Sequence, residues 1–291
     1  MLSEERVAQY ARDGYTVQEG LLSQEEVAAL LSDVESISAG NTLAQHDKTR
    51  MEMEPDQPPE GRLVRRLYEP CTYYPRFRAL SESAKLLDCV AQLLGPDLLF
   101  HYSKLNMKPP SIGSVVEWHQ DLAYYPLTNR DSLAVLFYLD DADIGNGCLQ
   151  IIPARHQDPL MNHTLDGFFQ GKITEPVNES LAVPVEGKEG AAILMNCMAP
   201  HASAPNRSGR PRRTLILSYR AADAYLIYSG ERTVQEEKQA RLVRGNRSAR
   251  ARFTMTEFPI PTSRTEYASL YELQEASRKD SGEPRSVGSG G

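Results

Sequence analysis

The second half of this chain contains a series of short apolar segments separated by glycine, proline and asparagine. β-Branched and aromatic residues are frequent in these segments, which is typical of strands. They lie at residues 98–108, 132–143, 147–154, 191–199 and 213–223. No long helical pattern separates them, so the succession predicts an all-β sandwich or a jelly-roll barrel over about residues 98–224.

The first 97 residues have a different pattern, which predicts mainly helices. Ser3 can cap a short helix that has acidic residues in its first turn, and Asp13-Gly14 stops it. The segment 15–22 is predicted to be a short strand. We therefore expect flanking helices packed beside a β core.

Two further helices are predicted before the β-rich region. Ser23 and Glu26 have the spacing of a capping box, and apolar residues follow at helical intervals. A later helix begins at Ser81 or Ser83 and ends at Gly95, which is followed by proline. These signals fix where the helices begin and end better than where they pack.

The remaining segments complete a single domain that is predicted to span residues 1–276. Residues 40–62 are polar and rich in proline, so we expect a mobile loop. The segment 157–180 is a long insert between two predicted strands, and residues 225–276 form a C-terminal extension. The polar end, residues 277–291, is expected to be disordered.

Composition limits the classes of protein that fit. A net charge of −7 argues against general binding of nucleic acid. No apolar run approaches the roughly 18 residues that a membrane span needs. Four widely spaced cysteines, with no CxxC pair, are typical of free thiols in a reducing compartment. We expect a cytoplasmic protein that acts on a small molecule, with neither nucleic acid nor membrane as partner.

The tripeptide His-Gln-Asp occurs twice, at residues 119–121 and 156–158. Residues i and i+2 of a strand point to the same side, so this spacing can supply a nitrogen and an oxygen ligand to one metal ion. A distant histidine such as His201 would complete the two-histidine, one-carboxylate set of non-haem Fe(II) oxygenases. For either copy, a surface histidine beside a solvated acid remains the alternative.

Three ordered stretches carry a resemblance to a known family. They are KLNMKPPSIGSVVEWHQDLAYYP, NGCLQIIPARH and HASAPNRSGRPRR. Together with flanking segments from residue 13 to residue 224, they resemble the phytanoyl-CoA dioxygenase family. The resemblance implies a double-stranded β-helix, which is a jelly-roll or cupin-like core. It also implies an Fe(II)-dependent dioxygenase with 2-oxoglutarate and O₂ as co-substrates, which oxidises an unactivated C–H bond and releases succinate and CO₂.

The resemblance also distinguishes the two His-Gln-Asp copies. It implies His119, Asp121 and His201 as the metal ligands. His156 matches a turn histidine of the family that is not a ligand, so the second copy would be accidental. An acid at position 121 favours hydroxylation, because halogenases of related fold have a small residue there.

A 2-oxoglutarate enzyme needs a cation for the distal carboxylate, and arginine suits it because its planar fork can donate two parallel hydrogen bonds. The residues alone leave several candidates open: Arg207, Arg210, Arg212 and Arg213. The resemblance selects Arg212 and adds Ser203. It also implies co-substrate contacts from Lys104, where the family commonly has an apolar residue, and from Phe137, whose alternative is core packing. We assign Gln120 to the same group.

The substrate is much less constrained by the sequence. Tyr124, Tyr125 and Arg66 are expected to contact it. If Arg62, Arg65 and Arg66 converge with the basic stretch 241–252 at the pocket mouth, the substrate is anionic, although a solvated helix face or loop is the alternative for that stretch. The competing interpretation of the whole chain is a cupin-like metal enzyme, or a binding protein, that does not use 2-oxoglutarate.

Overall fold

The computed structural model describes residues 1–112, 115–227, 237, 240–260, 262, 267 and 270–280. Its larger antiparallel sheet consists of β1 (Tyr15–Gln18), β2 (Met51–Met53), β3 (Val64–Tyr68), β4 (Leu98–Lys108), β6 (Ser132–Tyr138), β11 (Ala192–Asn196), β13 (Arg212–Ala221) and β14 (Arg241–Arg244). The smaller sheet consists of β5 (Val116–His119), β7 (Leu149–Ile151), β10 (Val183–Val185) and β12 (His201–Ser203). A separate hairpin consists of β8 (Thr164–Leu165) and β9 (Phe168–Phe169).

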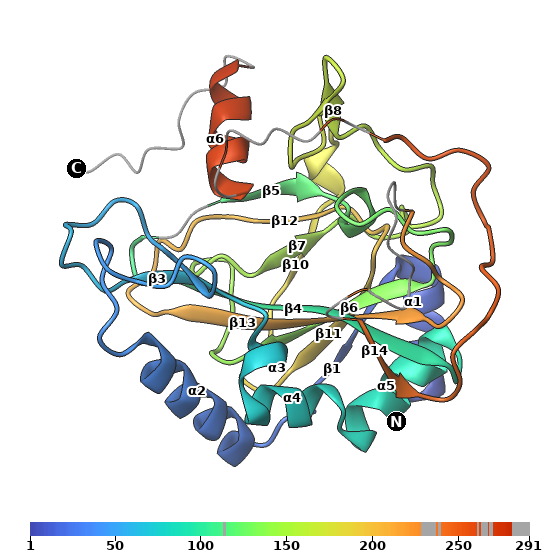
Figure 1. Ribbon diagram of the computed structural model, residues 1–291, viewed down its shortest axis with the longest axis horizontal. Helices are drawn as coiled ribbons and strands as arrows, with labels where there is room; N and C mark the ends of the chain where they lie inside the picture. The colour runs from blue at the N-terminus through green and yellow to red at the C-terminus, as the bar shows by residue number, and fades with distance from the viewer. Residues whose placement is uncertain are drawn as a thin grey trace.

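The two sheets face each other and form the jelly-roll (Figure 1). The larger sheet runs in the order β1-β11-β6-β13-β4-β3-β2, and β14 pairs with β4. The smaller one runs β10-β7-β12-β5. Neighbours in each sheet come from distant parts of the chain, as the jelly-roll prediction requires, and the predicted fold class is confirmed.

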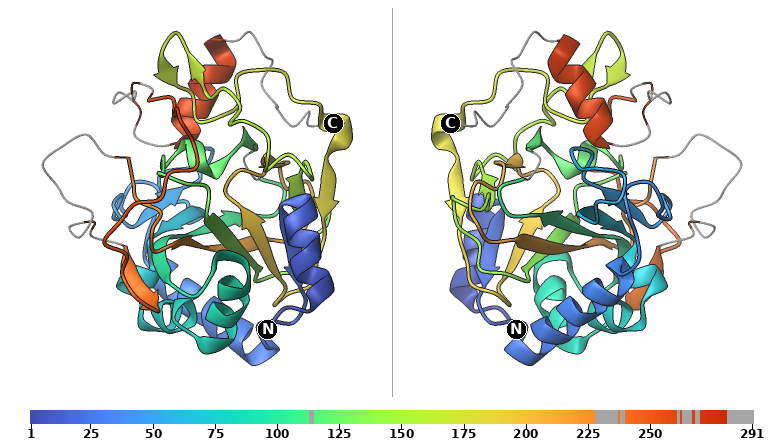
Figure 2. Two further views of the ribbon diagram at one scale, coloured as in Figure 1. Left: turned by 90° about the vertical axis from the view of Figure 1, so that its right-hand side faces the viewer. Right: turned by 90° about the vertical axis from the view of Figure 1, so that its left-hand side faces the viewer.

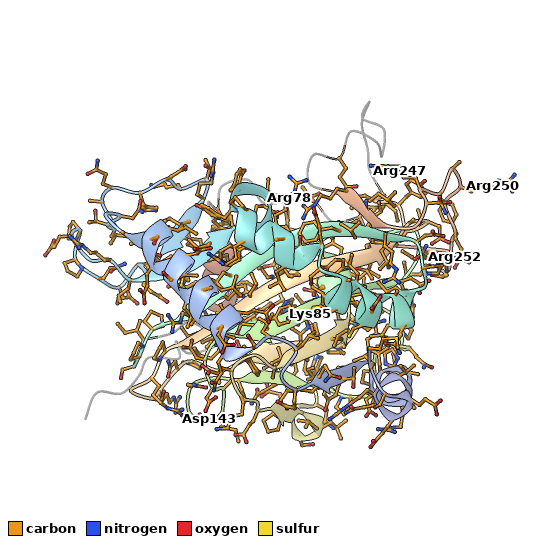
Figure 3. All side chains as sticks on the ribbon, turned by 90° about the horizontal axis from the view of Figure 1, so that it is seen from below. Arg78, Lys85, Asp143, Arg247, Arg250 and Arg252 are labelled. Carbon is orange, nitrogen blue, oxygen red and sulfur yellow. The ribbon has the colours of Figure 1, made fainter. Side chains whose placement is uncertain are left out.

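Helices flank this core on two sides. They are α1 (Glu4–Asp13), α2 (Gln24–Ser38), α3 (Pro70–Tyr73), α4 (Pro75–Ser81), α5 (Ala84–Leu94) and α6 (Leu270–Asp280), with 3₁₀ turns η1 (Asp121–Ala123) and η2 (Glu179–Leu181). Helices α2 to α5 cover the outer face of the larger sheet, as the view from below shows (Figure 3). Helix α6 lies at the other end of the molecule, beside the β8–β9 hairpin and above the smaller sheet (Figure 2).

The predicted helix boundaries are confirmed at the caps. The Ser3 hydroxyl accepts a hydrogen bond at the start of α1, and Gly14 ends that helix with φ 80°. Ser23 and Glu26 form both hydrogen bonds of the capping box of α2. Gly95 is the C-cap of α5. Short-range signals were sufficient here because each cap depends on residues only a few positions apart.

Three predictions about the flanking segments were wrong in part. The predicted strand at 15–22 is present as β1, but the first 97 residues also contribute β2 and β3 to the larger sheet, which were not predicted. The predicted loop 40–62 contains β2, whose Met51 and Met53 are buried. The tail does not begin at residue 277, because α6 continues to Asp280 and Ser277 is buried. Residues 281–291 lie outside the described part of the chain.

Alternation along the strands divides the core into two layers. Odd-numbered residues of β6, such as Leu133 and Val135, pack toward the helices. Even-numbered ones, such as Leu136 and Tyr138, pack between the two sheets. All four cysteines are buried and free. Among the described residues, no helix combines the length and the apolar character that crossing a membrane requires.

Candidate metal centre

Three side chains from two strands of the smaller sheet and the turn after one of them meet inside the jelly-roll. His119 ends β5, Asp121 begins η1, and His201 begins β12. In the register of the sheet, His201 lies opposite His119. The ligand atoms of the three residues all lie within 4.8 Å of one another, and all three residues are buried. The prediction that the first His-Gln-Asp copy and His201 come together therefore agrees with the geometry.

The orientation of the two imidazole rings fits metal binding. His119 Nδ1 lies 2.8 Å from the carbonyl of Glu117, and His201 Nδ1 lies 3.0 Å from that of Ala199. A carbonyl only accepts, so each Nδ1 carries the proton and each Nε2 keeps its lone pair. These Nε2 atoms face Asp121 Oδ1 at 3.7 and 3.9 Å. Backbone carbonyls of this kind fix the tautomer and orientation of histidine ligands.

Burial determines the protonation state of both imidazole rings. Burial lowers the pKa of His119 well below its ordinary value, with His201 as the next cause. Burial also lowers the pKa of His201, although Asp121 acts in the opposite direction. Both rings are thus neutral, which is the form that coordinates a metal. Two neutral imidazoles and one carboxylate fit a divalent ion with open positions.

Strand alternation was only part of the reason why His119 and Asp121 point the same way. Strand β5 ends at His119, so the prediction that both residues lie on one strand was wrong. Gln120 keeps an extended backbone, with φ −120° and ψ 130°, and this preserves the strand-like alternation for one more residue. The two ligands therefore still face the same side.

Gln120 itself points away from the centre, so its predicted contact with the co-substrate is wrong. Its side-chain nitrogen donates to the carbonyl of Met198 at 2.7 Å, and its oxygen accepts from the amide of Met161 at 2.8 Å. Its backbone N–H donates to His163 Nε2 at 3.0 Å. Gln120 and His163 thus fasten the ligand-bearing turn to the insert 157–180.

The second His-Gln-Asp copy lies elsewhere. His156 lines a separate cavity beside α1, together with Tyr10 and Asn196. Its ring packs against Gly14, where an added Cβ would come within 2.7 Å of it. Within the described residues, the metal-capable group contains only the first copy with His201. His156 has a packing role in this structure.

Among the four arginines after His201, Arg212 is the one that lines the cavity beside the metal centre. Its Nη1 donates to Thr214 Oγ1 at 2.7 Å, and its Nη2 lies 3.4 Å from Ser203 Oγ. Ser203 lines the same cavity, as predicted. Arg210 and Arg213 instead pair with Asp143 and Asp140. Arg212 and Ser203 could together hold a carboxylate.

A second cation beside Arg212 was missed. Lys108 lies opposite Arg212 in the β4–β13 register and is buried. Its Nζ donates to the carbonyls of Ser203 and Ala204. Burial, and next the charge of Arg212, holds the pKa of Lys108 well below its ordinary value. The alternating polar residues of LLFHYSKLNMK were the available signal for this side chain.

Phe137 does not belong to this pocket, and its predicted role is wrong. It is an odd-numbered residue of β6 and packs with Leu215 in the layer beneath the helices. Its neighbours Leu136 and Tyr138 line the cavity instead. The alternative of core packing is the one that the structure supports.

A larger cavity of about 450 Å³ opens on the other side of the centre. It is lined by the predicted residues Lys104, Tyr124, Tyr125 and Arg66, by Asp121, and by His101, Tyr102, Phe169, Ile216, Ser218 and Glu237. Arg66 and Lys104 line both cavities. Burial lowers the pKa of Lys104 to about 8. The Tyr124 hydroxyl donates to the carbonyl of Gly171 at 2.5 Å, which ties the insert to the cavity wall.

The two basic groups do not converge at this cavity. Residues 241–244 form strand β14, whereas a shared helical face was considered for them. Arg241 pairs with Glu82, and Arg244 pairs with Asp88. Arg247 and Arg250 lie at the edge of the molecule next to β14 (Figure 3). Of the residues in these two basic groups, Arg66 is among those that line the cavity.

A jelly-roll that brings two histidines and one carboxylate together at one end has the architecture of a non-haem Fe(II) oxygenase. The chain belongs to the phytanoyl-CoA dioxygenase (PhyH) family, whose model matches residues 10–214. It is an Fe(II)- and 2-oxoglutarate-dependent dioxygenase, and the predicted family, enzyme class and cofactors are confirmed.

Relatives with curated names support the same class. The chain is 34% identical to a "Probable alpha-ketoglutarate-dependent hypophosphite dioxygenase" of Stutzerimonas stutzeri, over 76% of this chain and 79% of that protein. It is 30% identical to a methylphosphonate hydroxylase of Gimesia maris, over 76% of this chain and 81% of that protein. An ectoine dioxygenase of Sphingopyxis alaskensis is 31% identical over 76% of each chain.

Solved structures agree with the fold. A crystal structure of EctD from S. alaskensis in its apoform superposes with a TM-score of 0.68 at 27% identity, and covers 85% of this chain and 88% of that one. The EctD structure with 2-oxoglutarate and 5-hydroxyectoine gives a TM-score of 0.64 at 28% identity, over 77% and 78% of the two chains.

Proposed function

We propose that this dioxygenase acts on a small anion, and that His119, Asp121 and His201 hold its Fe(II). The observation that carries the substrate class is the pair of cations, Arg66 and Lys104, in the same cavity as Asp121. Two relatives that share about a third of their residues with this chain are named for hypophosphite and methylphosphonate, both small phosphorus oxyanions. An ectoine dioxygenase is about equally similar to this chain, at 31% identity, so the relatives alone do not select the substrate class and the two cations carry the proposal.

The co-substrate end of the site is assigned to Arg212 and Ser203. Arg212 is buried and its fork is held by Thr214, which suits bidentate donation to the distal carboxylate of 2-oxoglutarate. When bound, Fe(II) supplies the oxidation in which 2-oxoglutarate and O₂ yield succinate, CO₂ and one oxygen atom for the substrate. The protein positions both reactants and shelters them from water.

The substrate end is assigned to the larger cavity. Its volume of about 450 Å³ accommodates a small molecule, and aromatic rings of Tyr124, Tyr125 and Phe169 enclose it. With a pKa of about 8, Lys104 is mainly cationic at neutral pH and can pair with an anion. Arg66 keeps its charge at any working pH.

The test has two stages. The protein is first mixed anaerobically with Fe(II) and 2-oxoglutarate, and a weak visible charge-transfer band is expected when the keto acid chelates the metal. O₂ is then admitted with hypophosphite, methylphosphonate or the zwitterion ectoine, and succinate is measured. We expect the two oxyanions to stimulate succinate release more than ectoine does. A protein without the band is no 2-oxoglutarate enzyme, and stimulation by ectoine alone contradicts an anionic substrate.

A further inference from the structure

His101 sits at a β-bulge in β4, next to the substrate cavity. In the β4–β13 pairing, Ser218 lies opposite Tyr102 and Tyr219 lies opposite Phe100, so His101 has no partner across the ladder. The buried faces change at this point: Leu98 and Phe100 pack toward the helices before it, and Leu105 and Met107 do so after it. A bulge re-aims side chains in this way, and bulges are frequent beside active sites.

As a result, two consecutive side chains of β4, His101 and Tyr102, both line the substrate cavity. The imidazole ring of His101 packs edge-on against Tyr125, with 4.5 Å between ring centroids. His101 is 8% exposed, so its ring is almost entirely surrounded by protein. A regular strand would send one of these two side chains into the helical layer.

Arg220 determines which ring nitrogen of His101 carries the proton. This arginine is fully buried, and its Nη1 lies 3.1 Å from His101 Nδ1. Glu237 Oε1 lies farther from the same nitrogen, at 3.5 Å, and already accepts a hydrogen bond from Arg220. Because the guanidinium is the nearer partner and has only donors, we assign Nδ1 as the acceptor and place the proton on Nε2. Glu237 accepts from Arg220 at 2.5 and 3.2 Å, which keeps the guanidinium in place.

The ring is also neutral. Burial lowers the pKa of His101, and this effect outweighs the neighbouring carboxylate of Glu237, which favours the protonated ring. Burial alone would raise the pKa of Glu237, but its contact with His101, and next that with Arg220, outweighs burial and lowers this pKa to about 2. Among the described residues, nothing accepts a hydrogen bond from His101 Nε2.

We propose that His101 is a substrate-binding residue whose Nε2–H donates to an oxygen of the substrate. This inference rests on the proposed function and adds a neutral, directional donor to the cations Arg66 and Lys104 in the same cavity. Of the two acids that line this cavity, Asp121 belongs to the metal centre and Glu237 accepts from Arg220, so His101, Arg66 and Lys104 remain as donors to the substrate. These donors favour an oxyanion over an ammonium group, because a donor that faces a donor stays unpaired. Arg220 and Glu237 are positioning residues, since they act through the tautomer of His101.

The tautomer can be measured without substrate. In the full-length protein loaded with diamagnetic Zn(II), ¹H–¹⁵N correlation spectra of the histidine rings distinguish Nε2–H from Nδ1–H. We expect Nε2–H for His101, whereas the carbonyl partners of His119, His163 and His201 require Nδ1–H in those rings. These three provide internal references. An Nδ1–H or doubly protonated His101 overturns the proposal.

Binding variants test the donor itself. Methylphosphonate is titrated into the Zn(II), 2-oxoglutarate-loaded protein by calorimetry. His101→Leu is expected to raise its Kd about 10-fold or more, while His101→Gln, which can accept from Arg220 and still donate, stays within about threefold of wild type. His46→Leu, at a histidine outside both cavities, is the matched control. The Kd of 2-oxoglutarate is expected to be the same in all four proteins.

The outcomes separate this proposal from the proposed function. An unchanged methylphosphonate Kd in His101→Leu, or an equal loss in His46→Leu, refutes the role of His101 even if the enzyme is active. Failure of wild-type protein to bind either methylphosphonate or hypophosphite refutes the oxyanion cavity. Absence of succinate release with Fe(II) and O₂ refutes the proposed function, whatever the tautomer of His101.

Discussion

Replacing Arg212 with alanine tests the co-substrate site most directly. The side chain is 5% exposed, and its guanidinium contacts Thr214 and Ser203 at the end of the cavity that contains both histidine ligands. The substitution removes the guanidinium donors of Arg212 and leaves the three proposed metal ligands in place. The expected result is a weaker affinity for 2-oxoglutarate with Fe(II) binding retained.

The magnitude follows from the kind of contact that is lost. Hydrogen bonds to a charged group contribute about 1.5–3 kcal/mol, which corresponds to a roughly 10- to 150-fold rise in Kd. Lys108 cannot compensate, because burial lowers its pKa and its Nζ is bound to the carbonyls of Ser203 and Ala204. Arg212→Lys retains a charge without the fork, so an intermediate loss is expected.

The assay is an anaerobic titration of 2-oxoglutarate into the Fe(II) protein, followed by the charge-transfer band. Arg210→Ala and Arg213→Ala are matched controls from the same segment, since these arginines pair with Asp143 and Asp140 outside the cavity. Both are expected to bind 2-oxoglutarate like the wild type. A loss in Arg210→Ala or Arg213→Ala as large as that in Arg212→Ala would refute the assignment.

Four further predictions concern the metal, the fold and the substrate. Alanine at any of the three proposed ligands should abolish Fe(II) retention on desalting, measured by iron analysis, whereas His156→Ala should retain the metal. Gly14→Ala should destabilise the protein by about 1–3 kcal/mol in urea unfolding, because φ is 80° and the new Cβ would lie 2.7 Å from the His156 ring; an unchanged midpoint contradicts this. Burial raises the pKa of Glu69 to about 7 from 4.5, so the folded protein binds more protons than the unfolded chain between these values and loses stability as pH rises through them. Glu69→Gln should remove up to about 3 kcal/mol of that pH dependence in urea titrations, and a slope equal to that of the wild type would count against it. Arg66→Glu should raise KM for an anionic substrate and Arg244→Glu should not, because Arg244 pairs with Asp88 away from the cavity; equal effects in steady-state kinetics would contradict the substrate site.

The features that the sequence predicted well depend on short-range chemistry or on ordered motifs. The capping box at Ser23 involves residues three positions apart, and it is present as predicted. The first His-Gln-Asp copy could be chosen because two further motifs follow it in the order that the family resemblance implies. A motif of three residues alone could not have excluded His156, whose separation from the centre is a property of the folded chain.

Errors of one position in strand phase account for the wrong co-substrate contacts. Phe137 and Gln120 both adjoin residues that do face the centre, and each points to the opposite side. Alternation predicts that neighbours face opposite sides, but β6 is buried at every position and apolar from Leu133 onward, so its own sequence does not show which side chains face the metal centre. The phase is set by pairing with β11 and β13, which are distant in the sequence.

His101 and Glu237 were missed because their roles depend on contacts across more than a hundred residues. The bulge at His101 arises from a mismatch between β4 and β13, and neither segment shows it alone. Glu237 reaches His101 and Arg220 from the C-terminal extension. Lys108 was within reach of prediction, because a lysine inside an otherwise buried strand needs a specific partner.

Strand β13 links the two ends of the site, because it presents an arginine near each end on the same face. Arg212 begins the strand at the co-substrate cavity, and Arg220 lies near its end, against His101. The even-numbered residues between them line the cavities, while the odd-numbered ones pack beneath the helices. Regular pairing with β6 keeps this alternation intact from Thr214 to Arg220. The irregularity is therefore confined to β4, where one extra residue places His101 against Arg220 without moving Arg212. A change in the β4 bulge would alter the donor His101 near the end of β13 and leave Arg212, at its start, in place. Substrate recognition can therefore vary separately from co-substrate binding.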